Sequence, residues 1–175
     1  MSETNGGLPV YIESKERAMQ RHAAGFASGD AARETIAAEC TAADLSGARH
    51  VRIRDFELIS DSGPGFGGSS TGPSSPELLL GVLASCLTHI YLIGAAHQGI
   101  ALEAVHVRFE AENNDAGLLG LETADPPFPF NIRGRVRVVS REAPERLAAL
   151  HDYAINACPL TKLVREPQTV TIEVE

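Results

Sequence analysis

The sequence predicts an α+β fold, because its expected strands come in consecutive runs that helices separate, instead of alternating one by one with helices. The predicted order is helix, two strands, glycine-rich loop, apolar helix, two strands, helix, strand. The chain has 175 residues, of which 43% are hydrophobic and 22% charged, which suits one globular domain with an arm. A net charge of −8 and the absence of tryptophan argue against nucleic-acid binding.

The N-terminal arm is predicted as a polar helix from Glu13 to about Ala27, which the glycine at position 29 ends. We therefore divide the chain into an arm, residues 1–32, and a main domain, residues 33–175. The arm has no apolar segment behind a basic patch, so it does not resemble a secretion signal and a cytoplasmic location is expected.

Two strands are predicted next, at Arg33–Thr41 and His50–Ser60, and the turn residues of segment 44–47 predict a hairpin between them. The hydrophobic positions of the second strand change phase near Arg54, which predicts a bulge or bend there.

A glycine- and proline-rich loop, residues 61–75, leads into the most apolar helix of the chain. Ser74 and Glu77 have the spacing of a capping box, Pro76 suits the first turn, and Gly99 suits the end of the helix. Residues 78–96 carry no Lys, Arg, Asp or Glu and approach the length of a membrane span. Polar residues within the segment and the lack of flanking basic clusters favour a buried core helix and no membrane association.

The C-terminal half alternates apolar and polar residues over Ala104–Glu112 and Ile132–Val138, which predicts two half-buried strands. A helix is predicted over Ala143–Asn156, with Pro159 ending it, and a last strand over Gln168–Glu175.

Three cysteines are too few for a secreted disulfide scaffold, and no CxxC pair indicates a zinc or thioredoxin-type site. Cys86 lies in the apolar helix and Cys158 before a proline, so each is either a small buried side chain or a reactive thiol. If the two meet in space, one could attack a peroxide and the other resolve the product. Cys40 is interpreted as a packing residue of its strand.

Other polar residues also have two interpretations. His89 follows Cys86 by three residues on the same helix face, so it is either a base or cation beside the thiol or a core histidine. Glu77 caps the helix, holds an arginine over the thiol, or does both. Alternating arginines at 133, 135 and 137 form a solvated strand face or an anion site. No metal-ligand set is indicated.

Two motifs resemble the OsmC/Ohr superfamily, the osmotically induced and organic-hydroperoxide-resistance proteins. Residues 67–87, GGSSTGPSSPELLLGVLASCL, are similar to its GG-x-x-x-GP…E-LLL-x-x-L-x-SC signature. Residues 157–161, ACPLT, are similar to its second cysteine motif. The resemblance covers about residues 33–175 and implies an OsmC-like fold, with antiparallel sheets around a long central apolar helix in an intertwined homodimer.

The resemblance also implies chemistry. In the family's peroxidases the first cysteine reduces an organic hydroperoxide and the second forms a disulfide with it, which assigns those roles to Cys86 and Cys158. A dithiol reductant of the lipoyl type restores the pair, and no bound cofactor or metal is used. We expect Glu77 to complete the catalytic set. Leu78, Leu79, Leu87 and His89 are expected to bind the substrate, with phenylalanines of the partner chain.

At one point that bears on activity, this sequence departs from the pattern of the hydroperoxide reductases. In the hydroperoxide reductases an Arg–Glu pair activates the thiol, with the Glu ten residues before the cysteine. Here Glu77 is nine before Cys86, and Arg49, Arg52 and Arg54 are the candidate arginines. The first hypothesis is therefore a thiol-dependent peroxidase for organic hydroperoxides. The alternative is an OsmC-like stress protein that binds a small apolar ligand or senses redox state without efficient turnover.

Overall fold

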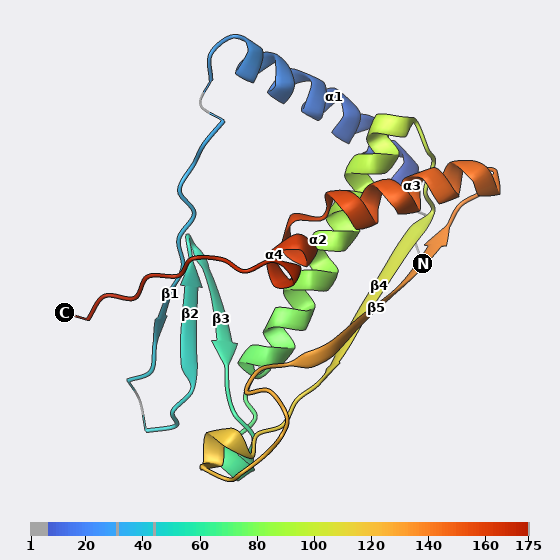
Figure 1. Ribbon diagram of the computed structural model, residues 1–175. Helices are drawn as coiled ribbons and strands as arrows, with labels where there is room; N and C mark the ends of the chain where they lie inside the picture. The colour runs from blue at the N-terminus through green and yellow to red at the C-terminus, as the bar shows by residue number, and fades with distance from the viewer. Residues whose placement is uncertain (1–6, 31, 44, 175) are drawn as a thin grey trace, which may run out of the picture. The chain divides into compact units, whose positions relative to one another are not determined.

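The computed structural model describes residues 7–30, 32–43 and 45–174 (Figure 1). The chain divides into two compact units, which are described separately. The first contains the segment up to Ala27, Leu83–Glu110 and the chain from Arg133 onward; the second contains Ser28–Val82 and Ala111–Ile132. The α+β class predicted from the sequence is confirmed, with small antiparallel sheets beside helices.

The second unit is built on a three-stranded antiparallel sheet in the order β1-β2-β3, formed by Glu39–Thr41, Arg49–Ile53 and Phe56–Ser60. The predicted strand Arg33–Thr41 is therefore too long. In the observed register Glu39 pairs with Arg52, one residue before β2 ends, so among the described residues β2 offers no partner to residues 33–37.

The predicted strand His50–Ser60 is also wrong in form, because the chain reverses at its middle. Ile53 pairs with Phe56, and Arg54 between them has a φ of 55°, so two residues make a tight turn where a bulge or bend within one strand was expected. Arg54 is not a residue type that marks such a turn. The turn residues predicted between β1 and β2 do connect them, although position 44 lies outside the described residues.

The loop after β3 is organised by one carboxylate. Asp61, 2% exposed, accepts hydrogen bonds from the N–H groups of Ser62 (2.7 Å), Ser69 (3.1 Å) and Thr71 (3.0 Å), and from the Thr71 hydroxyl (2.9 Å). These bonds, led by that from the Thr71 backbone, lower the pKa of Asp61 to about 2. The loop, which contains the short helix η1 (Pro64–Phe66), is thus closed around a carboxylate that stays ionised at neutral pH.

Two glycines let the loop approach its own backbone. A Cβ at Gly68 would lie 2.1 Å from the Ser62 carbonyl oxygen, and one at Gly72 would lie 2.2 Å from the Ile59 carbonyl oxygen. Both contacts are with backbone and cannot be relieved by turning a side chain. The GG-x-x-x-GP spacing of the sequence therefore has a steric cause.

Replacing Gly72 with alanine is expected to lower the free energy of unfolding by about 1–3 kcal/mol, the range for an overpacked site. Gly65→Ala is the matched control, because a Cβ there meets nothing within 4 Å. Its free energy of unfolding should change by less than about 0.5 kcal/mol. Urea denaturation of the two variants checks this, and equal midpoints would contradict it.

The apolar helix α2 spans Ser75–Gln98, and its ends confirm the local signals. Pro76 lies in its first turn, and Gly99 follows its end with a φ of 59°. Helix α2 has 24 residues, and an 18-residue window within it has a mean hydropathy of 2.0, so it is long and apolar enough to cross a membrane; core helices of soluble proteins meet the same two criteria.

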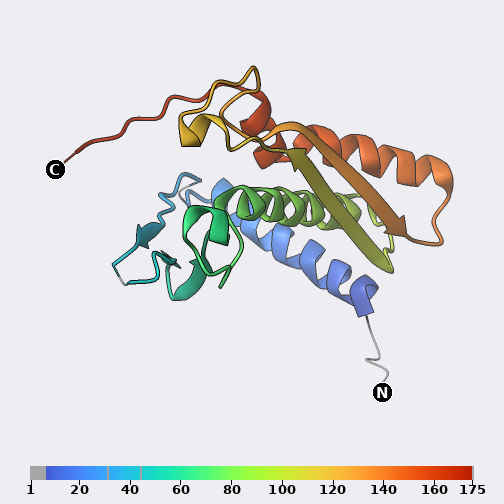
Figure 2. The same cartoon turned by 90° about the horizontal axis from the view of Figure 1, so that it is seen from below.

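In the first unit, the α2 residues from Leu83 onward lie between helix α1 (Gly7–Ala27) and the ribbon of β4 (Ala104–Glu112) and β5 (Phe130–Val139), as Figure 2 shows. Helix α1 begins six residues before its predicted start. Leu8, Ile12 and Met19 of α1 contact the core cluster of this unit, so the arm contributes to a hydrophobic core.

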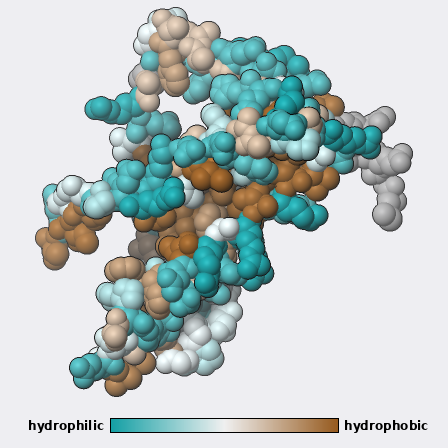
Figure 3. All heavy atoms as spheres, turned by 45° about the vertical axis from the view of Figure 1, so that its right-hand side comes forward, coloured by the Kyte–Doolittle hydropathy of each residue, from teal (hydrophilic) through white to brown (hydrophobic). Residues whose placement is uncertain are grey.

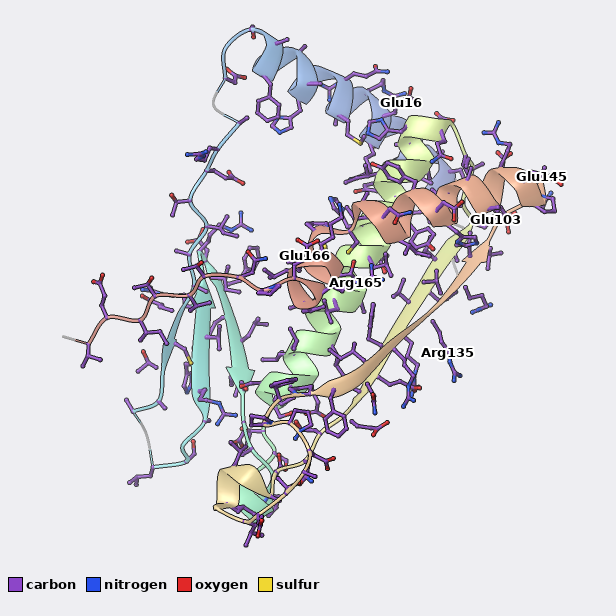
Figure 4. The ribbon with its side chains drawn as sticks, in the orientation of Figure 1. Glu16, Glu103, Arg135, Glu145, Arg165 and Glu166 are labelled. Carbon is purple, nitrogen blue, oxygen red and sulfur yellow. The ribbon has the colours of Figure 1, made fainter. Side chains whose placement is uncertain are left out.

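Two more helices complete the unit: α3 (Pro144–Ala157), close to its predicted range, and α4 (Pro159–Arg165), which was not predicted. The side chains that line the outside of the ribbon include Arg135, which extends from β5 on the side away from α2 (Figure 4) and is 82% exposed. Glu110 lies within 3.9 Å of this guanidinium and also pairs with Arg108 and Arg133, so the alternating arginines form a solvated, ion-paired face.

Among the described residues, segment 167–174 has no regular structure, so the predicted strand Gln168–Glu175 is not observed there; its last residue, Glu175, lies outside the described residues. The apolar side chains of this segment, Val170, Ile172 and Val174, are 77–96% exposed. The alternation that predicted the strand is present, but pairing needs a second strand, which local sequence cannot supply.

Candidate redox site

Two cysteines far apart in sequence meet in the first unit. The Sγ atoms of Cys86 and Cys158 are 3.7 Å apart, although the residues are separated by 72 positions. Both are free thiols; Cys86 is half-buried and Cys158 is 0% exposed. The third cysteine, Cys40, is exposed on β1 of the other unit. Only a shift of about 1.7 Å separates the observed sulfur distance from the bond length of a disulfide, about 2.05 Å.

Local structure explains why Cys158 is held at this point. It is the residue between α3 and α4, and its N–H donates to the carbonyl of Ala154 at the end of α3. Pro159 then begins α4, where its missing N–H costs nothing. Cys158 therefore lies at a corner between two helices whose backbone is fixed on both sides.

The pKa values of the two thiols are shifted in opposite directions. Burial raises the pKa of Cys86, and the neighbouring Cys158 raises it further, against a hydrogen bond from the Leu160 backbone. Burial also opposes ionisation of Cys158, but hydrogen bonds outweigh it and lower its pKa. They come from Thr161, from the Cys86 thiol and from the Leu160 backbone. Cys86 is thus the more accessible thiol, and Cys158 the more acidic.

His89 is exposed, and the pKa of its imidazole is lowered, first by partial burial and then by the charge of Lys15 on α1. A lowered pKa keeps this imidazole neutral at neutral pH, so it supplies no cation beside Cys86. The other predicted substrate-binding residues are distributed along α2: Leu78 is half-buried, Leu79 is 36% exposed, and Leu87 belongs to the buried core.

Glu77 forms the predicted cap of α2. Its Oε2 atom accepts hydrogen bonds from the Ser74 hydroxyl and the Ser74 N–H, both 2.7 Å, and these bonds lower its pKa. Because one residue of helix corresponds to about 100° of rotation, Glu77 and Cys86 project from opposite sides of α2, about 13.5 Å apart along the helix axis.

A separate cavity of about 840 Å³ lies within the second unit. Its lining includes Glu77, Arg49 and the apolar side chains of Phe66, Leu80 and Leu118. The Arg49 guanidinium donates to the hydroxyls of Ser60 (3.2 Å) and Ser62 (3.3 Å), while its buried Nε–H has no partner among the described residues.

The other two candidate arginines are occupied elsewhere. Arg52 forms an ion pair with Glu39 across β1 and β2. The Arg54 guanidinium lies 5.3 Å from the Phe56 ring centre. The sequence could not choose among the three arginines, because the choice depends on sheet register. In the described parts of the chain, no three His, Cys, Asp or Glu side chains gather closely enough to hold a metal ion.

The α+β fold and the two adjoining thiols make this chain a protein with a paired-cysteine site. The family model described as "OsmC-like protein" matches residues 67–173, which contain both cysteine motifs. The chain therefore belongs to the OsmC-like family, which confirms the resemblance found in the sequence. The comparison with curated proteins gives no match.

Solved structures show the same fold at low identity. An OsmC-like protein from Mycoplasma pneumoniae is 13% identical with a TM-score of 0.64, over 75% of this chain and 88% of that one. The organic hydroperoxide resistance protein OsmC from Legionella pneumophila is 20% identical with a TM-score of 0.56, over 77% and 92%. An organic hydroperoxide resistance protein from Elizabethkingia anophelis is 16% identical with a TM-score of 0.56, over 78% and 91%.

Proposed function

We propose that this protein is a cysteine-based, thiol-dependent peroxidase that reduces organic hydroperoxides. The observation that carries the proposal is the 3.7 Å distance between the Sγ atoms of Cys86 and Cys158. The names of the hydroperoxide resistance proteins that share the fold agree with this activity.

The proposed reaction has two oxidative steps. The Cys86 thiolate attacks the outer oxygen of the hydroperoxide, the O–O bond breaks, and the alcohol leaves with a proton, which gives a sulfenic acid at Cys86. The Cys158 thiolate then attacks the Cys86 sulfur, the S–S bond forms, and the sulfenic oxygen leaves as water.

The different roles of the two cysteines follow from how exposed each thiol is and how acidic it is. A hydroperoxide can reach the half-buried Cys86, whereas Cys158 is fully covered. Cys158 is held for the second step by hydrogen bonds that favour its thiolate. Because the pKa of Cys86 is raised, its thiolate forms when solvent water takes the proton, and the solvent returns a proton to the departing alkoxide. A dithiol of the lipoyl type is proposed to return both sulfurs to thiols by exchange, in a reducing, cytoplasmic setting.

The test is peptide mapping after one equivalent of cumene hydroperoxide. The wild type should lose two hydrogens and yield a Cys86–Cys158 linked peptide pair within seconds. Cys40→Ser is the matched control and should behave as the wild type, because Cys40 is exposed and lies in the other unit. A Cys86 that stays reduced for minutes in excess peroxide would refute the peroxidase.

We also propose that two copies form a homodimer around α2. Hydrophobic side chains remain at the surface of the single chain (Figure 3), among them Phe56, Leu118 and Phe128, each more than 60% exposed. The unpaired C-terminal segment offers the edge of a further strand. Light scattering that returns the monomer mass, 18.6 kDa, would refute the dimer.

The alternative function, ligand binding without turnover, is favoured by the 840 Å³ cavity of the second unit, whose walls combine Phe66, Leu80 and Leu118 with a guanidinium. A protein of this kind would bind an apolar ligand and consume no hydroperoxide in steady state. Turnover with a dithiol reductant separates it from the peroxidase.

A further inference from the structure

Helices α2 and α3 contact each other at two further places near the cysteines, and we call this line of contacts the α2–α3 seam. At Gly94 a Cβ would lie 2.5 Å from Tyr153 Cδ1 and 2.8 Å from Leu150 Cδ1. The missing side chain therefore lets the two helices approach closely. Figure 1 shows α3 crossing α2 in this region.

The second contact is a hydrogen bond between a buried phenol and a half-buried imidazole. The Tyr91 hydroxyl and the His151 Nδ1 atom are 2.8 Å apart, and the rings meet edge to face at 5.6 Å between centroids. Tyr91 is 0% exposed, and burial raises the pKa of its hydroxyl, which therefore keeps its proton at neutral pH. A buried phenol needs a partner, and here His151 is the one recorded.

This bond and the sulfur pair join the same two helices. Tyr91 follows Cys86 by five residues on α2, about 7.5 Å along the axis. On the other side, His151 lies in α3, seven residues before Cys158, which follows its last turn. If α3 slid or turned on α2, the Tyr91 hydroxyl would lose its acceptor while still buried, and Cys158 would move away from Cys86.

We propose that Tyr91 and His151 are positioning residues whose hydrogen bond holds Cys158 within reach of Cys86; this inference rests on the proposed redox role of the cysteine pair. Neither side chain takes part in the chemistry. Their effect is on the effective concentration of one thiol at the other, which sets how readily the disulfide forms.

The experiment measures the equilibrium constant for formation of the Cys86–Cys158 disulfide, without peroxide. Reduced and oxidised dithiothreitol exchange with the cysteine pair: the two protein thiols give up two protons and two electrons, and the cyclic disulfide of the reagent takes them up to become its dithiol. Wild type and variants are equilibrated over a range of buffer ratios, and alkylation followed by intact mass gives the oxidised fraction. Thermal melting confirms that each variant is folded.

Tyr91→Phe should lower the equilibrium constant for disulfide formation about three- to tenfold, the effect of losing one hydrogen bond. Tyr153→Phe is the matched control. It makes the same chemical change at the same seam, and no hydrogen bond of the Tyr153 hydroxyl is recorded among the described residues. It should stay within about twofold of the wild type.

A second pair of variants tests His151 as the hydrogen-bond partner of the Tyr91 hydroxyl. Asparagine can place an amide oxygen near the Nδ1 position of histidine, so His151→Asn should keep more of the wild-type equilibrium constant than His151→Leu. A Tyr91→Phe constant equal to that of the wild type overturns the inference, whatever peroxide does. If the wild type forms the disulfide in dithiothreitol but not with hydroperoxide, the proposed function fails and the inference stands. A wild type that never forms the disulfide overturns both.

Discussion

Replacing Cys86 with serine should lower steady-state hydroperoxide consumption at least about 100-fold, because a serine hydroxyl is not ionised near neutral pH and is a far weaker nucleophile than a thiolate. Cys158→Ser should act differently. The first equivalent of peroxide should still be reduced, and consumption should then stop as sulfenic acid accumulates at Cys86. Peroxide consumed per subunit, with dimedone trapping of the sulfenic acid, measures both outcomes.

The structure makes the comparison of the two variants informative, because exposure and acidity favour different thiols. Cys86 is the half-buried sulfur, but Cys158 is the one whose pKa is lowered. If Cys86→Ser still reduced one equivalent and Cys158→Ser reduced none, acidity would outweigh access and the proposed roles would be exchanged. Cys40→Ser should keep full turnover and controls for the loss of a thiol as such.

Arg49→Met is the second large effect we expect, a fall of about 10- to 100-fold in the affinity of the second unit's cavity for an apolar ligand with a charged acceptor group, the range for a hydrogen bond to a charged group. Arg49 lines the same cavity as Glu77, and its buried Nε–H is free to donate. Arg49→Lys should recover only part of the affinity, because an ammonium keeps the charge but not the planar fork.

Arg52→Met and Arg54→Met are the matched controls for this prediction. Arg52 is held by Glu39, and Arg54 lies over Phe56, so neither contributes a guanidinium to that cavity. Both variants should keep the affinity of the cavity, measured by equilibrium titration with a long-chain fatty acid, within about twofold of the wild type. Similar losses in all three would show that positive charge in general, and not Arg49, supports binding. Circular dichroism of each variant separates loss of binding from loss of fold.

Prediction from sequence succeeded where the signal is local. Ser74, Glu77 and Gly99 mark the ends of α2 by chemistry that acts within one turn, and the structure confirms each of them. The strand Ala104–Glu112 was predicted with its observed bounds, because a half-buried strand carries its alternation along its whole length.

It failed where the pairing of elements decides. The change of hydrophobic phase near Arg54 fits a bulge or bend as well as a turn, and only the pairing of β3 with β2 shows that the chain reverses there. For the same reason the nearness of Cys86 and Cys158 could not be derived from their spacing, only suggested by resemblance. His151 lies within the predicted helix Ala143–Asn156, but nothing in the sequence paired it with Tyr91.

The loop closed around Asp61 has a consequence for how this sequence can change. Asp61, Gly68 and Gly72 belong to one arrangement, since the carboxylate draws in the backbone and the glycines leave room for it. A substitution at any one of them removes the benefit of keeping the other two. We expect relatives to retain or to lose these three residues together, while the side chain of Ser69, which contributes only its N–H to the carboxylate, varies freely.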